Sequence, residues 1–163
     1  MRKIMNPRNL ILTGLTVTVL QIASAQAIGS WDYELKNDLY AGTTNDSSNT
    51  FGQQCLTSDR TCRYFVGLPT FCKEEASQPA LVNVDSGAFH ARLVCIGRGG
   101  RYNLYRYVFE DFGSIDSALQ SSKRIGIAVP MEGSEVMVLR FQLDGAVAAI
   151  KMMRNAADRA IAR

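Results

Sequence analysis

Histidine is almost absent from this 163-residue chain, which contains only His90, and its four cysteines are never spaced as C-x-x-C. Protein zinc sites are built from cysteine and histidine ligands at short, repeated spacings. These two shortages argue against a zinc site, and we expect neither a metal nor a cofactor. The G-x-S-x-G pattern of hydrolase nucleophile elbows is also missing.

The chain also lacks an excess of charge once its first 27 residues are set aside. It has 18 Lys and Arg against 15 Asp and Glu, and three of the basic residues lie in that segment: Arg2, Lys3 and Arg8. The remaining residues, 28–163, are therefore formally neutral. A neutral domain has no general electrostatic attraction for nucleic acid or anionic membranes, so we expect no nucleic-acid partner.

The segment of residues 1–27 has the organisation of a signal peptide. Its basic start is followed by an apolar run over residues 10–22 and by the small-x-small sequence Ala25-Gln26-Ala27. The alternative is a membrane anchor, but the apolar run is short for a bilayer span. We expect cleavage before Ile28, a periplasmic or secreted protein, and no stable membrane insertion afterwards.

The four cysteines all lie in the expected mature domain, residues 28–163. In an exported protein they predict two disulfides, for which three connectivities exist. Cys55 and Cys62 flank a segment whose Ser-Asp pair can form a turn, which favours a bond across a hairpin. That pairing leaves Cys72 for Cys95, while the other two connectivities remain open.

The stretch of residues 124–162 carries the clearest fold signal, which reads strand, turn, strand, helix. Apolar residues alternate along both strands, and Asp144 is a suitable N-cap for the helix. The helix has one apolar stripe, formed by Ala146, Ala149, Ile150, Met153, Ala157, Ala160 and Ile161. We expect the helix to fold back on the sheet, so that Phe141 and Ile150 enter the same core.

The preceding residues read as further strands. Alternation predicts strands at 31–35, 62–68 and 102–109, and a hairpin of 80–84 with 88–96 around a turn at 85–87. Residues 41–54 and 97–100 are rich in Gly and small polar residues and are predicted as loops. Ser114 is expected to cap a short helix. The fold class is therefore α+β, mostly β: an antiparallel sheet or sandwich of about six to eight strands, with a short helix and a C-terminal helix packed on it.

Two groups of side chains suggest function. Asp85, Ser86 and His90 are the residue types of a hydrolase triad, but Asp-Ser-Gly is an ordinary hairpin turn and His90 alternates with apolar residues, so it should face solvent. We therefore expect no catalytic residues and no enzyme activity. A cell-wall or glycan hydrolase is the alternative.

Basic and aromatic residues interleave between positions 92 and 107. The candidate binding residues are Arg92, Arg98, Arg101, Tyr102 and Tyr105, with Arg106 and Tyr107 nearby. Such sets bind proteins or polyanions, although a solvated strand face is the simpler reading. We expect a non-enzymatic binding protein whose partner is another protein or an envelope component. A second alternative is an inhibitor or immunity protein that blocks a toxin or lytic enzyme with residues 41–54 or 97–101.

The order of short motifs resembles a known family. Its elements are Trp31 on the first strand, Val82-Asn83-Val84-Asp85 leading to Cys95, Ala118-Leu119, Ile125-Gly126-Ile127-Ala128, Phe141-Gln142-Leu143-Asp144-Gly145 and Ala148-Ala149-Ile150. This order is similar to the invasion-associated locus B family of bacterial exported proteins, mainly over the second half of the chain. The resemblance implies a small, virulence-associated periplasmic or surface protein linked to host interaction, and it carries over no catalytic residue.

Overall fold

The computed structural model describes residues 26–35, 39–58, 60–100, 102–131, 133 and 135–161. Most of the expected signal peptide, residues 1–25, lies outside the described residues, and so does Arg101. Gln26 and Ala27 lie in the first strand, β1 (Gln26–Ile28), which pairs with β2. Cleavage before Ile28 would therefore leave Ile28 as the sole remaining residue of β1.

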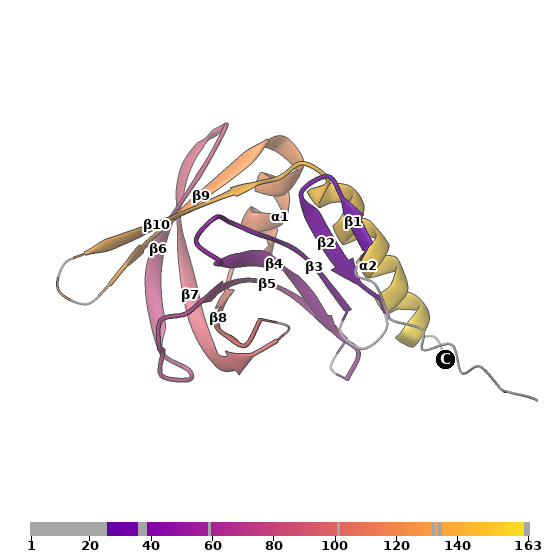
Figure 1. The fold of residues 1–163 in the computed structure, drawn as a ribbon, viewed down its shortest axis with the longest axis horizontal. Coiled ribbons are helices and arrows are strands. Elements are labelled where there is room, and N and C mark those ends of the chain that lie inside the picture. Colours follow the sequence, from indigo (N-terminus) through magenta and orange to yellow (C-terminus); the bar gives the residue numbers. More distant parts are fainter. Residues whose placement is uncertain are drawn as a thin grey trace, which may run out of the picture.

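The described part of the chain forms one antiparallel sheet of ten strands and two helices (Figure 1), which confirms the expected fold class. The strand order is β1-β2-β3-β4-β5-β8-β7-β6-β9-β10. The other elements are β2 Trp31–Glu34, β3 Leu39–Thr44, β4 Thr50–Leu56, β5 Thr61–Leu68, β6 Ser77–Val84, β7 Gly87–Gly99, β8 Leu104–Phe109, α1 Phe112–Ser121, β9 Arg124–Pro130, β10 Val136–Gln142 and α2 Ala146–Ile161.

The sheet curls until its two ends approach each other. The Nε1 of Trp31, at the start of β2, donates to the carbonyl of Gln142 at the end of β10, with a distance of 3.0 Å. Beside it, the Ser30 amide donates to the carbonyl of Asp144 at 3.1 Å. The β9–β10 hairpin extends away from this junction and α2 lies at the opposite side of the molecule (Figure 1).

Aromatic rings fill the centre of the curled sheet. Phe51 is fully buried, and its ring centroid lies 5.5 Å from Phe141, 6.0 Å from Trp31, 6.2 Å from Phe109 and 6.4 Å from Tyr64. These five residues come from β4, β10, β2, β8 and β5, so one cluster of rings ties together strands from both halves of the sheet.

Helix α2 docks on the sheet as expected, and Phe141 and Ile150 belong to one hydrophobic core. Its apolar stripe is buried from Ala146 to Ala157, while Ala160 is exposed. The main contacts of α2 are with β1 to β4 and with α1, rather than with the β9–β10 hairpin that precedes it in the chain. The helix therefore covers the first strands and closes the core at that end.

Two predicted loops are strands. Residues 41–54 belong mostly to the hairpin of β3 and β4, in which Thr44 pairs with Thr50. Residues 97–99 form the end of β7, in which a β-bulge lies between Cys95 and Arg98. Composition was misleading in both places because the small residues there serve close strand contacts and a bulge. The loop predicted for residues 41–54 is therefore wrong.

Both helices begin at a residue other than the one the sequence suggested. Asp111 caps α1, since its carboxylate accepts from the amide of Ser114 at 3.1 Å, and Ser114 itself lies inside the helix. Because α2 begins at Ala146, Gly145 rather than Asp144 precedes it. Gly145 has φ +85° and lies against the Ile28 carbonyl, only 1.8 Å from where a Cβ would stand, so the tight approach of β1 requires glycine.

A polar network joins α2 to α1 and to the sheet. Arg154 forms an ion pair with Asp116 and donates to Tyr64 at 3.0 Å and to Gln53 at 2.7 Å. Burial opposes ionisation of Asp116, but hydrogen bonds from Arg154 and Tyr64 and the charge of Arg154 outweigh it, so the pKa of Asp116 lies below its ordinary value. Burial and the hydrogen bond to Asp116 raise the pKa of Tyr64.

The depressed pKa of Asp116 predicts a loss of stability in acid. Stability from this ion pair is complete above the unfolded pKa of about 3.9 and is lost as the pH falls through the lower folded value. Asp116→Asn should lower the free energy of unfolding at pH 7 by about 1–2 kcal/mol, between the values of exposed and fully buried pairs. Denaturant titrations from neutral pH to below pH 4 should show this difference shrinking, whereas exposed Asp158→Asn should match the wild type throughout.

Candidate functional site

The connection between β5 and β6 is held against β7 by a disulfide. Cys72 is bonded to Cys95, and the second bond joins Cys55 to Cys62, so the expected pairing is confirmed. The connection is also hydrogen-bonded to β7, because the amide of Glu75 donates to the Cys95 carbonyl at 2.9 Å and the amide of Cys95 donates to Ala76 at 2.9 Å. This anchoring fixes the residue next to Cys72, which is Phe71.

Phe71 is the most exposed member of a cluster of aromatic and basic side chains in which Tyr105 contacts the other two. Its side chain is 71% exposed, the largest exposed fraction among the large hydrophobic residues described. Its ring meets Tyr105 edge-on, with centroids 5.4 Å apart and planes at 75°. The guanidinium carbon of Arg98 lies 5.5 Å from the centroid of Tyr105. We call Phe71, Tyr105 and Arg98 the aromatic–basic cluster.

The irregular end of β7 places Arg98 in this cluster. The β-bulge after Cys95 brings Arg98 into register with Tyr105, and Gly97 has φ +81°, a conformation that favours glycine. The Nε of Arg98 donates to the Asn103 carbonyl at 2.8 Å, which fixes the guanidinium beside the ring. The cluster is therefore ordered by a bulge, a turn and a disulfide.

A groove of about 490 Å³ borders the cluster. It runs between the β5–β6 connection and the β9–β10 turn, and Phe71, Tyr107 and Met131 are among its lining residues. Tyr107 is buried, and this burial raises the pKa of its hydroxyl, so it lines the groove as a neutral group. The exposed ring of Phe71 stands at the border of this groove, and a groove beside an exposed aromatic ring is suited to hold a side chain of a partner.

The structure brings together only some of the predicted binding residues. Arg98 and Tyr105 are in contact, and Tyr102 is exposed in the turn before β8. Arg92 lies nearer the start of β7, where it donates to Ser77 at 3.1 Å and lies 3.6 Å from Glu110, so it belongs to a separate, solvated ion pair. Arg101 lies outside the described residues. Phe71 was missed, and its only signal in the sequence was its position beside Cys72.

The triad residue types do not form a triad. The Oδ2 of Asp85 accepts from the backbone amide of Lys123 at 2.7 Å, which ties the β6–β7 turn to the start of β9. His90 is exposed, pairs across β6 with Leu81, and has no hydrogen bond to Ser86 or Asp85. Asp85 therefore has a structural role in the hairpin, and His90 faces solvent as the sequence predicted.

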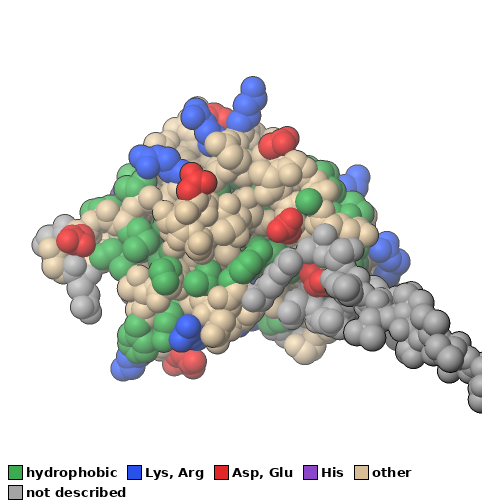
Figure 2. All heavy atoms as spheres, in the orientation of Figure 1, with side chains coloured by type: hydrophobic (Ala, Val, Ile, Leu, Met, Phe, Trp, Pro, Cys, Tyr) green, Lys and Arg blue, Asp and Glu red, His purple; other side chains and the backbone are tan. Residues whose placement is uncertain are grey.

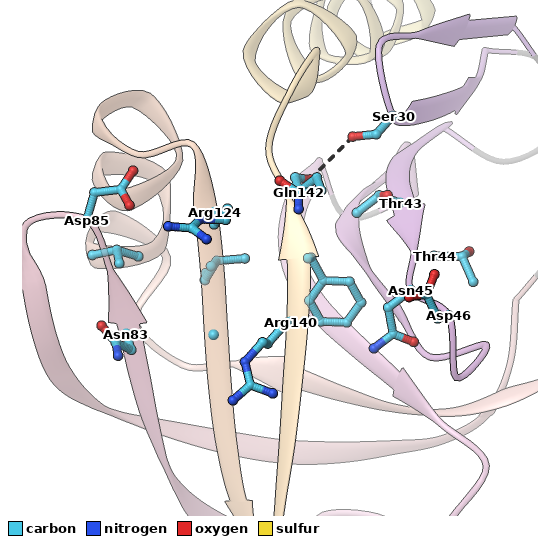
Figure 3. A pocket seen from close by; sticks show the side chains of 14 residues that line it. Ser30, Thr43, Thr44, Asn45, Asp46, Asn83, Asp85, Arg124, Arg140 and Gln142 are labelled. Carbon is cyan, nitrogen blue, oxygen red and sulfur yellow. Dashed lines mark hydrogen bonds between the residues drawn. The ribbon is translucent and has the colours of Figure 1, made fainter.

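A second, more polar cleft of about 510 Å³ lies where β10 and the β3–β4 hairpin diverge (Figure 3). Arg124 and Arg140 border it on the side of β9 and β10. Thr44, Asn45 and Asp46 border it on the other side. Neither guanidinium donates a hydrogen bond or forms an ion pair within the described part of the chain.

The curled sheet, its two disulfides and the C-terminal helix that closes the core define a small disulfide-bonded β protein. A solved structure shares this architecture: the crystal structure of invasion associated protein B from Bartonella henselae is similar over 83% of this chain and 99% of that chain, with a TM-score of 0.58 and 15% sequence identity. The resemblance expected from the short motifs is thus confirmed at the level of the fold. No protein-family profile matches the chain, and no curated protein matches its sequence.

Among the described residues, the helices are too short or too polar to cross a membrane.

Proposed function

We propose that the chain is an exported, non-enzymatic binding protein of the periplasm or cell exterior, and that it contacts another protein or an envelope component through the aromatic–basic cluster. The observation that carries this proposal is the exposure of Phe71 on a segment fixed by a disulfide. An immobilised ring loses little conformational entropy on binding, and aromatic residues and arginine supply most hot spots of interfaces.

Export is supported by two disulfides, because such bonds persist in oxidising compartments. The signal-like start of the sequence agrees with it. A virulence-associated role in host or envelope interaction is the further part of the proposal. It rests on the likeness in fold to a protein that is named for invasion.

Affinity capture tests the binding site. Immobilised oxidised protein comprising residues 28–163 should retain a specific component from the envelope of its own cells. Phe71→Ala should reduce this retention at least about tenfold, because truncation of a central hot spot costs roughly 2 kcal/mol or more. Quantitative mass spectrometry of the retained proteins and glycans is the measurement.

The matched control is Val147→Ala, which truncates another exposed apolar side chain on the outer side of α2. It should retain the same component as the wild type. Equal retention by Phe71→Ala and wild type would assign binding to another surface, and no retention above a blank matrix would contradict the proposal.

A further inference from the structure

Within the part of the chain that the structure describes, β10 is the last strand of the sheet, and no other strand pairs with its outer edge. The amide of Met131 donates to the carbonyl of Glu135, and the amide of Leu143 donates to the carbonyl of Lys123. The main-chain groups of Glu135 and Leu143 therefore point to the β9 side. In an antiparallel pair these groups alternate, so the amides and carbonyls of Val136, Val138 and Arg140 point outward. The next outward carbonyl, that of Gln142, accepts from Trp31, which agrees with this phase.

This edge has little of the usual protection against pairing. Natural edge strands carry proline, a bulge or charged side chains, and the only one of these in β10 is the charge of Arg140. β10 has no proline, and its register with β9 is continuous from Val136 to Gln142. Val136 and Val138 are 59% and 48% exposed, and Leu81, two strands away on the same face, is also exposed. Figure 2 shows hydrophobic side chains on the visible surface of this side of the molecule.

The open edge combines this apolar surface with positive charge. Arg140 lies on the same face as Val138, and Gly126, its neighbour on β9, carries no side chain that would cover it. Arg124 is on this face one row further along, opposite Gln142. Both side chains are among those that line the cleft beside β10, and Figure 3 shows them on its β9–β10 side, away from Asn45 and Asp46 of the β3–β4 hairpin.

We propose that the free edge of β10 binds an extended segment of another protein as an added strand, with an apolar residue against Val138 and an acidic residue against Arg140. Main-chain bonds to Val136, Val138 and Arg140 would supply affinity, and the alternating side chains would supply specificity. This surface is separate from the aromatic–basic cluster, so it goes beyond the proposed function and does not depend on it.

Charge complementarity favours this occupant over a second copy of the chain. Two β10 strands could pair about Val138, but that register places each Arg140 opposite the Val136 of the other copy. Both guanidinium groups would then enter the interface without a carboxylate. A segment with an acidic residue at that position instead forms a cross-strand ion pair.

A phage-displayed library of random linear peptides, selected against the folded protein comprising residues 28–163, tests the proposal. Selected sequences should alternate apolar and acidic residues. On binding, the amides of Val136, Val138 and Arg140 should gain protection from hydrogen exchange and change their NMR shifts. The amides of Phe71 and Tyr105 should stay unchanged, which separates this surface from the aromatic–basic cluster.

Two variants with one control make the test specific. Val138→Pro removes an outward amide without removing a bond to β9 and should weaken the selected peptides at least about tenfold, while Val138→Ile keeps both the amide and an apolar side chain and should bind as the wild type. Arg140→Glu, which leaves the backbone intact, should shift the selection from acidic to basic peptides.

Three outcomes overturn the proposal. The first is a selection that yields no alternating acidic sequences. The second is selected peptides that bind wild type and Arg140→Glu equally. The third is a concentration-dependent dimer in sedimentation that Val138→Pro abolishes, because it would assign the edge to a second copy of the chain.

Discussion

Phe51→Ala is expected to lower the free energy of unfolding by about 3–5 kcal/mol, the range for loss of a buried aromatic ring that leaves a cavity. The ring is fully buried and contacts rings from four other strands, so the site has little freedom to collapse. Denaturant unfolding at neutral pH, followed by tryptophan fluorescence, measures the change, because Trp31 lies against Phe51.

The same experiment reveals whether the two halves of the sheet share one core. Phe141→Ala should also cost about 3–5 kcal/mol. Because its ring centroid lies 5.5 Å from that of Phe51, the double variant should depart from additivity by more than about 0.5 kcal/mol. Strict additivity, or a Phe51→Ala midpoint equal to that of the surface variant Val147→Ala, would contradict the single aromatic core.

Much of the second half of the fold could be predicted because alternation there is regular. Ile125, Ile127 and Val129 are buried in β9, as are Leu139 and Phe141 in β10. The apolar stripe of α2 was recognisable in the same way. Local patterns do not encode which strands are neighbours, so the sequence could not show that α2 would pack on β1 to β4.

The β3–β4 hairpin was hidden by the composition that packing requires. A Cβ on Gly52 would stand 2.4 Å from the carbonyl oxygen of Ala41, and one on Gly42 would stand 2.8 Å from the carbonyl oxygen of Phe51 on the neighbouring strand. Glycine is needed at these positions for close approach between strands. The residues that made residues 41–54 look like a loop are therefore part of the reason that they can form tightly packed strands.

The candidate site was only partly predictable. Arg98 and Tyr105 were recognised from their residue types, but their contact depends on a bulge that shifts the register. Phe71 depends on a disulfide between distant residues. The open edge of β10 follows from the pairing of β9 with β6, which are not consecutive strands, so no local pattern could have shown it.

Removal of the Cys72–Cys95 disulfide should lower the free energy of unfolding by about 3.4 kcal/mol in the chain-entropy estimate, because the bond closes a loop with a sequence separation of 23. The Cys55–Cys62 bond closes a separation of only 7, and its removal should cost about 2.4 kcal/mol. Cys95 and Cys55 are both buried, so the paired alanine variants are well matched. Thermal or denaturant unfolding of Cys72→Ala/Cys95→Ala and Cys55→Ala/Cys62→Ala should give this order.

The same pair of variants separates stability from binding. Without Cys72–Cys95, Phe71 is no longer fixed against Tyr105, so capture of the envelope component should fall even under conditions in which the variant is fully folded. Without Cys55–Cys62, which lies at the β4–β5 turn, capture should equal that of the wild type. If both variants fold and retain the component equally well, the disulfide does not present Phe71 to a partner. Loss of capture only in Cys55→Ala/Cys62→Ala would move the binding surface to the β4–β5 turn.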